Sequence, residues 1–157
     1  MKKLILIIFT FIFTTISFGQ RMENEIFKAS KGKWEIPIAK YQIVKFNTYN
    51  EPTVFKYSSF ITDSSYEVNS VEAGIVEKII TPDSLHFLVI IKSGNYYVTY
   101  NLLSNLYIKT DDYIKRNQKI GVLGKNVDGK YELIFNLYKG KNNMNPKTWF
   151  NWKKNKK

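Results

Sequence analysis

The sequence predicts a mainly β fold, a single antiparallel β-sheet or sandwich-like domain built from hairpins and preceded by a signal peptide. Short runs rich in β-branched and aromatic residues recur along the chain with turn residues between them. No window longer than about ten residues keeps a helical period. The 157 residues, 44% hydrophobic and 16% aromatic, can bury one sizeable core. These observations favour one globular domain.

The first 20 residues have the pattern of a signal peptide. Lys2 and Lys3 precede an uncharged apolar run from Leu4 to Phe18, and small and polar residues follow up to Gln20. The run is shorter than the roughly 20 residues that a membrane-spanning helix needs, so an uncleaved anchor is the weaker alternative. We therefore expect an exported protein of the periplasm or cell envelope, without a stable membrane span after signal cleavage.

The charge of the chain favours an anionic neighbour. Removal of residues 1–20 leaves 22 basic and 13 acidic side chains, a net charge of +9. For an exported protein the candidates are peptidoglycan carboxylates, lipid head groups or an acidic partner, whereas the compartment disfavours nucleic acid. A biased codon usage that enriches Lys, Asn, Ile and Tyr together explains the charge equally well. The chain has no cysteine, which excludes disulfides, a lipid-modified cysteine and thiolate metal sites.

The mature chain divides into three parts: a lead-in over residues 21–32, a β domain over 33–152 and a solvated basic tail over 153–157. The lead-in is expected to be poorly ordered or a single helical turn. The expected strands cover 34–38, 41–46, 53–57, 75–80, 85–91, 96–101, 120–124 and 131–138. The run 85–91 is apolar on both faces, which is typical of a central strand. Ser93, Gly94 and Asn95 form the signal for a tight hairpin after it.

Five segments of the domain form a collinear set of motifs. They are Val68–Val76, Val89–Gly94, Thr99–Ser104, Ile108–Gly124 and Leu133–Trp149. In order and spacing they resemble the lysostaphin/LytM-type zinc metallopeptidase family, whose fold is a duplicated hybrid motif. The resemblance covers roughly residues 33–152 and is faint before residue 66. It implies a β-sheet with a substrate groove and, in active members, a zinc centre that cuts peptide cross-links in bacterial cell walls.

Two departures from the family pattern preserve its turns. Family glycines are replaced by Asp111 and Asn117. Asp and Asn are the non-glycine residues that best tolerate a positive φ. We therefore expect both turns to be retained.

The residues that hold zinc, or that serve the reaction beside it, in active family members are replaced. The family His-x-x-x-Asp motif falls at Phe55 and Ser59, and its His-x-His motif falls at Glu132 and Ile134. A further family histidine falls at Leu102. We therefore expect no catalytic residue, no metal and no cofactor here, zinc being the cofactor of active relatives. A separate pair of carboxylates, Asp63 and Glu132, makes a poor cage for a metal.

The single histidine, His86, lies inside the predicted central strand, away from the family positions. A lone strand histidine is more often packed or hydrogen-bonded than a ligand.

The replaced site still leaves a groove that could bind without cutting. Period two places Glu132, Ile134, Asn136 and Tyr138 on the face of the 131–138 strand that would look into the family groove. The candidate groove residues are Phe55, Ser59, Tyr100, Leu102, Glu132, Ile134, Asn136 and Tyr138.

The leading hypothesis is a non-catalytic LytM-like envelope domain that binds peptidoglycan or regulates a cell-wall hydrolase. The alternatives are an active zinc endopeptidase with displaced ligands, a structural envelope protein, and a groove filled by its own side chains.

Overall fold

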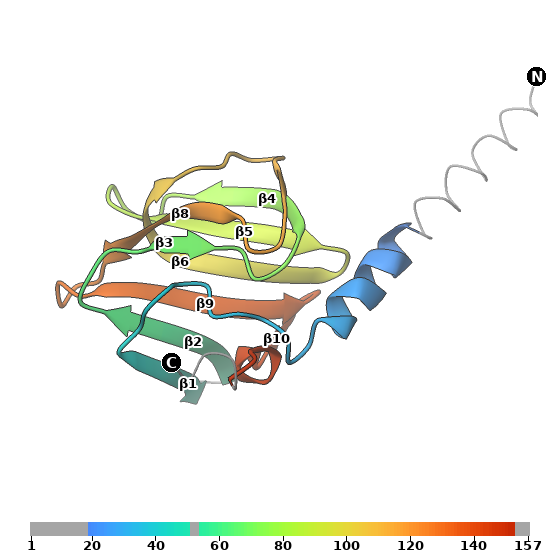
Figure 1. Cartoon of the computed structure of the whole chain (residues 1–157), viewed down its shortest axis with the longest axis horizontal. Coiled ribbons are helices and arrows are strands. Elements are labelled where there is room, and N and C mark those ends of the chain that lie inside the picture. Colours follow the sequence, from blue (N-terminus) through green and yellow to red (C-terminus); the bar gives the residue numbers. More distant parts are fainter. Residues whose placement is uncertain (1–18, 51–53, 153–157) are drawn as a thin grey trace, which may run out of the picture.

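The computed structural model describes residues 19–50 and 54–152, with the side chains of 43–56 left out of the description. Within this part of the chain, ten strands form one sheet (Figure 1). The strands are β1 (Ile43–Asn50), β2 (Val54–Thr62), β3 (Glu67–Asn69), β4 (Gly74–Ile80), β5 (Phe87–Ser93), β6 (Tyr96–Leu106), β7 (Tyr113–Ile114), β8 (Lys119–Lys125), β9 (Tyr131–Lys139) and β10 (Asn142–Met144). A short 3-10 helix, η1, covers Pro146–Trp149.

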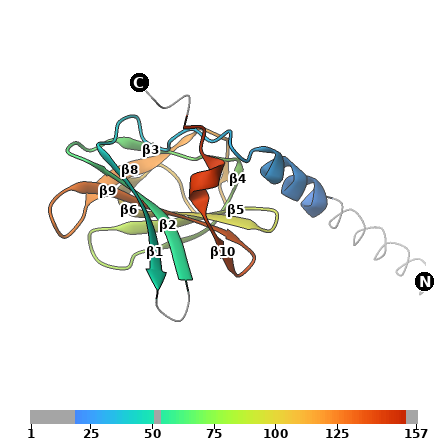
Figure 2. The same cartoon turned by 90° about the horizontal axis from the view of Figure 1, so that it is seen from below.

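The sheet is antiparallel and curled, as the sequence predicts. Its order is β1-β2-β9-β8-β6-β5-β4-β7, with β10 added to β9 and β3 added to β8. The long strand β9 also pairs with β6, so it contacts strands from both halves of the sheet. Figure 2 shows β1 and β2 crossing the direction of β5 and β6 at a steep angle, which follows from the right-handed twist of strands. The mainly β prediction is confirmed.

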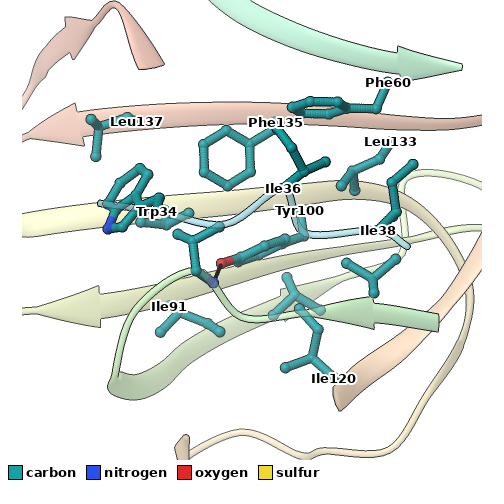
Figure 3. Close-up of a cluster of buried hydrophobic side chains, with 14 of the residues drawn as sticks. Trp34, Ile36, Ile38, Phe60, Ile91, Tyr100, Ile120, Leu133, Phe135 and Leu137 are labelled. Atoms are coloured by element: carbon teal, nitrogen blue, oxygen red, sulfur yellow. Dashed lines mark hydrogen bonds between the residues drawn. The ribbon is translucent and has the colours of Figure 1, made fainter. Parts of the chain in front are cut away.

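The core lies on the inner face of the curled sheet. Alternate residues of β9, Leu133, Phe135 and Leu137, are fully buried, as are Val98 and Tyr100 of β6. Figure 3 shows Tyr100 and the three β9 side chains converging with Trp34, Ile36 and Ile38 from the segment before β1. Full burial of one such apolar side chain contributes roughly 1.5–3 kcal/mol. Alternation along the strands thus turns one face of β6 and β9 toward the core, and the side chains of the other face point away from the core.

The lead-in is more ordered than expected. Residues 19–29 are helical, and this segment extends from one end of the sheet (Figure 1). Phe27 is buried and stacks on Tyr96 with ring centroids 4.2 Å apart. Glu23 Oε2 and Asn24 Oδ1 accept the backbone N–H groups of Gly94 and Asn95. The expected single turn is therefore too short, because the hairpin supplies hydrogen-bond partners that the local sequence does not reveal.

Two predicted strands differ from the structure. The segment 34–38 is not a strand and makes only isolated bridges, Trp34 to Phe150 and Ile38 to Val68. Instead, its apolar side chains are buried and pack in the hydrophobic core. The hairpin of β1 and β2 is longer than predicted, because residues 47–50 continue pairing as far as Asn50 with Val54. Backbone ladder bonds are independent of side-chain polarity, which is why the polar residues there did not end the strand.

The predicted turn chemistry is confirmed. Asp111 has φ 71° and Asn117 has φ 62°, so both adopt the left-handed conformation of the family glycines. The backbone N–H of Asp111 donates to the Val76 carbonyl and that of Asn117 to the Ser70 carbonyl. Gly94 has φ 57° at the predicted hairpin.

The predicted signal peptide and basic tail are not described. The signal peptide, residues 1–20, falls almost wholly in residues 1–18, and the tail is 153–157. Both stay predictions. No helix within the described residues is long and apolar enough to cross a bilayer.

Candidate functional site

The outer face of the sheet carries an open groove of about 740 Å³. It is lined by Tyr57, Leu88, Ile90, Tyr97, Thr99, Asn101, Ile134, Asn136, Tyr138 and Gly140. These residues come from β2, β5, β6 and β9 and the turn after β9. Ile134, Asn136 and Tyr138 are the face of β9 that period two assigned to the groove, and the structure brings them together there.

The groove lining combines aromatic, aliphatic and amide side chains. Thr99 and Asn136 are direct partners across β6 and β9, and the Thr99 hydroxyl donates to Asn136 Oδ1 at 3.2 Å. Burial raises the pKa of the Tyr138 hydroxyl, and a hydrogen bond with Asn143 offsets part of this increase. No Lys, Arg, Asp, Glu or His is among the described residues that line the groove. The groups in this lining are suited to stacking and hydrogen bonding, and not to charge pairing.

A polar cluster lies next to the groove at the β8–β9 end. Ser59 of β2 pairs with Ile134 of β9 and is buried. Its hydroxyl donates to Glu132 Oε1, and Asn126 Nδ2 donates to Glu132 Oε2 at 2.7 Å. Asn126 in turn accepts the backbone N–H groups of Asp128 and Lys130, which fixes its side chain. Ser59 stands at a replaced zinc-ligand position and Glu132 at the first histidine of the family His-x-His motif, so a hydrogen bond now joins two replaced positions of the family site.

Of the other three replaced positions, Ile134 lines the groove, and Phe55 and Leu102 have different surroundings. The backbone of Phe55 lies in β2 and pairs with Tyr49, and its side chain is outside the described residues. Leu102 is half-buried in β6 with φ 68°. A left-handed leucine costs roughly 1–2 kcal/mol, and β6 shifts register beside it. The Asn101 side chain compensates in part by accepting the Leu102 N–H at 2.8 Å.

His86 is hydrogen-bonded, as expected, but its placement differs from the prediction. It precedes β5 instead of lying inside a strand. Its Nδ1 is 2.9 Å from Asp83 Oδ2, and its Nε2 is 2.8 Å from the Lys125 carbonyl oxygen. Hydrogen bonding to His86 is the main reason that the pKa of Asp83 is lowered. The His86 ring also lies against Gly124, which pairs with Glu132 of β9. His86 is therefore closer to the replaced family histidine at Glu132 than the sequence indicated.

Tyr100 does not belong to the groove. Its side chain is fully buried, and its ring packs edge-on against Phe135 at 5.4 Å. The hydroxyl accepts the backbone N–H of Val71 at 2.9 Å, as the dashed line in Figure 3 shows. The prediction was wrong because Tyr100 has the core parity of β6. Its neighbours of opposite parity, Thr99 and Asn101, line the groove instead.

Tyr100 makes the stability of the fold sensitive to alkaline pH. Burial raises the pKa of its hydroxyl, whereas an unfolded tyrosine ionises near pH 10. The unfolded chain therefore loses this proton first, and the free energy of unfolding should fall as pH rises above about 10, by up to about 1.4 kcal/mol per pH unit.

Tyr100→Phe should reduce that slope and, by leaving the Val71 N–H unpaired, cost about 1–3 kcal/mol at pH 7. Urea unfolding at pH 7 to 11 measures both quantities. The same change at the exposed Tyr107 should stay within about 0.5 kcal/mol of the parent chain at pH 7. An unchanged slope in Tyr100→Phe would refute the assignment.

Sequence reasoning missed seven groove residues, namely Gly140 in the turn after β9 and six that the sheet pairing brings in. Tyr57, Tyr97, Thr99, Asn101, Leu88 and Ile90 all line the groove. The signal for Leu88 and Ile90 was present, because they form the second apolar face of the predicted central strand. Asn126 had no such signal, since its role depends on the turn between β8 and β9.

A match to a protein-family model identifies the family of the chain. The model described as peptidase family M23 matches residues 58–146, more than half of the chain. The chain belongs to peptidase family M23. The matched range contains β3 to β10, most of β2 and every groove-lining residue except Tyr57. The comparison with curated proteins finds no match.

Solved structures share the fold of this M23 domain. Csd3 of Helicobacter pylori matches with TM-score 0.64 and 21% identity over 74% of this chain and 33% of its own. The catalytic domain of the prophage-encoded M23 protein EnpA from Enterococcus faecalis matches with TM-score 0.56 and 19% identity. The match covers 76% of this chain and 97% of the EnpA domain. A chain of the SpoIIQ–SpoIIIAH pore-forming complex matches with TM-score 0.54 and 25% identity. The match covers 68% of this chain and 70% of the chain in the complex. The present chain spans about a third of the Csd3 chain.

The residues at the metal positions of this M23 domain do not fit zinc. Zinc sites in proteins use imidazole, thiolate and carboxylate ligands, and catalytic sites need three of them. The three zinc-ligand positions hold Phe55, Ser59 and Ile134, and these residue types offer none of these groups. At the neighbouring Glu132, both carboxylate oxygens already accept hydrogen bonds. Within the described part of the chain, no three His, Cys, Asp or Glu side chains come together as a metal site. The residues at these positions therefore support no zinc-dependent hydrolytic step.

Proposed function

We propose that this M23 domain is a non-catalytic LytM-type domain of the cell envelope. It binds peptidoglycan, or regulates a cell-wall hydrolase, through the groove that serves as the substrate site in active relatives. The apolar run Leu4–Phe18 supports export, and the surplus of basic residues favours an anionic cell-wall neighbour.

The observation that carries this proposal is an intact groove beside a zinc site with unsuitable residues. A volume of about 740 Å³ is enough for several residues of an extended peptide. Tyrosine rings offer stacking surfaces, and the amides of Asn101 and Asn136 offer hydrogen bonds. The groove can therefore keep its binding role without a metal.

Ile134→Arg should strongly weaken binding to purified peptidoglycan or to an envelope hydrolase. Ile134 lies in the groove lining on β9, so the substitution introduces a bulky charge into an uncharged surface. We expect at least a tenfold loss of affinity, measured by co-sedimentation with cell-wall sacculi and by pull-down of envelope hydrolases. Leu85→Arg is the control, because Leu85 is 71% exposed outside the groove and its substitution should leave binding unchanged. Equal binding by both variants would contradict a groove site.

The enzyme alternative makes a separate prediction. An active zinc endopeptidase with displaced ligands requires about one zinc per purified chain and wall digestion that a chelator stops. The donor set described above argues against it, so we expect neither. Metal analysis together with a turbidity assay on cell walls measures both.

A structural role in a protein assembly is the second candidate. It is favoured by the likeness to a chain of the SpoIIQ–SpoIIIAH pore-forming complex, where an M23-like fold occurs in a protein–protein assembly. A pull-down from envelope extract that recovers a stable non-hydrolase complex, unaffected by Ile134→Arg, would support this candidate.

A further inference from the structure

Resting on the proposed function, we infer that the groove ligand carries a primary ammonium group, which Glu132 binds at the end of an otherwise uncharged groove. The ligand would be an extended, mostly uncharged segment with a free amino group, either a peptide N-terminus or an amine-bearing side chain.

The position of Glu132 follows from the register of β9. Tyr138, Asn136 and Ile134 line the groove in turn along one face of this strand. Glu132 is the next residue on the same face, roughly 7 Å beyond Ile134. The groove-lining row of β9 therefore leads directly to a carboxylate.

The groove-facing side chains of strand β2 lead toward the same end of the groove. Tyr57 lines the groove, and Ser59 is the next residue on that face and pairs with Ile134. The Ser59 hydroxyl donates to Glu132. Two neighbouring strands thus place the carboxylate at the same end of the groove, and Asn126 holds it from the β8–β9 turn.

Glu132 has no counter-ion within the described part of the chain. It forms no salt bridge there, although the chain contains 24 lysine and arginine residues. Among the basic groups near the β8–β9 end, His86 is occupied by Asp83 and the Lys125 carbonyl, and the Lys125 ammonium lies over the Tyr131 ring at 5.3 Å. Because no cation among the described side chains neutralises this half-buried carboxylate, a ligand cation would gain from binding it.

The remaining hydrogen-bonding capacity of Glu132 suits an ammonium group. A carboxylate offers about four lone-pair sites, and Ser59 and Asn126 occupy two of them. An ammonium group is a compact donor with three N–H bonds and needs no further protein ligand. A metal ion would need ligands that the neighbouring residues do not supply.

The test compares three synthetic peptides on the purified chain by NMR titration at low ionic strength. One is tetra-alanine amide with a free N-terminus, the second is its acetylated form, and the third is an acetylated peptide with one lysine. The two ammonium-bearing peptides should bind about tenfold tighter than the acetylated tetra-alanine, which corresponds to about 1.4 kcal/mol. A preference for only one of them identifies which source of the amine fits.

The variant Glu132→Gln should remove this preference and keep binding of the acetylated peptide. It retains an oxygen that can accept from Ser59, and circular dichroism checks its fold. Glu67→Gln is the matched control, because Glu67 is a carboxylate on β3 that pairs with Lys119 outside the groove lining. This control should keep the tenfold preference.

The possible failures separate the two proposals. Equal binding of all three peptides would overturn the ammonium site and leave the groove function standing. A preference that persists in Glu132→Gln would also overturn it, because another group would then be responsible. Absence of binding by every peptide would overturn the groove function and this inference with it. The peptide comparison on the unmodified chain holds even if Glu132→Gln does not fold.

Discussion

Trp34→Ala should destabilise the domain by about 4 kcal/mol, the largest effect that we expect from one substitution. Trp34 is fully buried, and its ring lies 4.8 Å from that of Trp149 and 5.5 Å from that of Phe27. Its indole N–H donates to Ser30 and points toward Glu72. Since the free energy of unfolding of a protein domain is only about 5–15 kcal/mol, the variant should be close to unfolding at 37 °C.

Urea unfolding followed by circular dichroism measures this loss, because that signal does not depend on the deleted indole. Trp152→Ala is the control, since Trp152 is only half-buried near the end of the described chain. Its loss should be less than half as large. A Trp34→Ala chain within about 1 kcal/mol of the parent would show that the 34–38 segment is not part of the cooperative core.

Gly121→Ala should cost about 2–3 kcal/mol through a backbone collision. Gly121 lies in β8 opposite Leu106 of β6, and a methyl group there would collide with the carbonyl oxygen of Asn105. Because that oxygen belongs to the backbone, the two strands would have to separate. Thermal unfolding should show a clearly lower midpoint than in the parent chain.

Gly129→Asn is the control for glycine replacement in general. Gly129 has φ 75°, and a Cβ atom added to it would meet no other atom within 4 Å. Asparagine tolerates this left-handed conformation. We expect a change below about 1 kcal/mol. If Gly121→Ala were as mild as Gly129→Asn, the close approach of β6 and β8 would be contradicted.

The candidate site could be predicted in part, because strand parity is a local property. The face of β9 that carries Ile134, Asn136 and Tyr138 follows from period two alone, and it does line the groove. The prediction was wrong for Tyr100, because which parity of β6 faces the core depends on its register against β9. The same limit applies to Asn126 and His86, whose partners come from distant turns.

The sequence by itself determined the mainly β fold, the family motifs, the two left-handed turns at Asp111 and Asn117, and the replacement of the zinc ligands. These features depend on residue identity and short spacing, which a single chain records directly. Only the tertiary structure decided that the lead-in docks as a helix, that residues 34–38 are buried in the core without forming a strand, and that no charged side chain is among the described residues that line the groove. Each of these depends on contacts between segments far apart in the chain, and such contacts leave no local pattern.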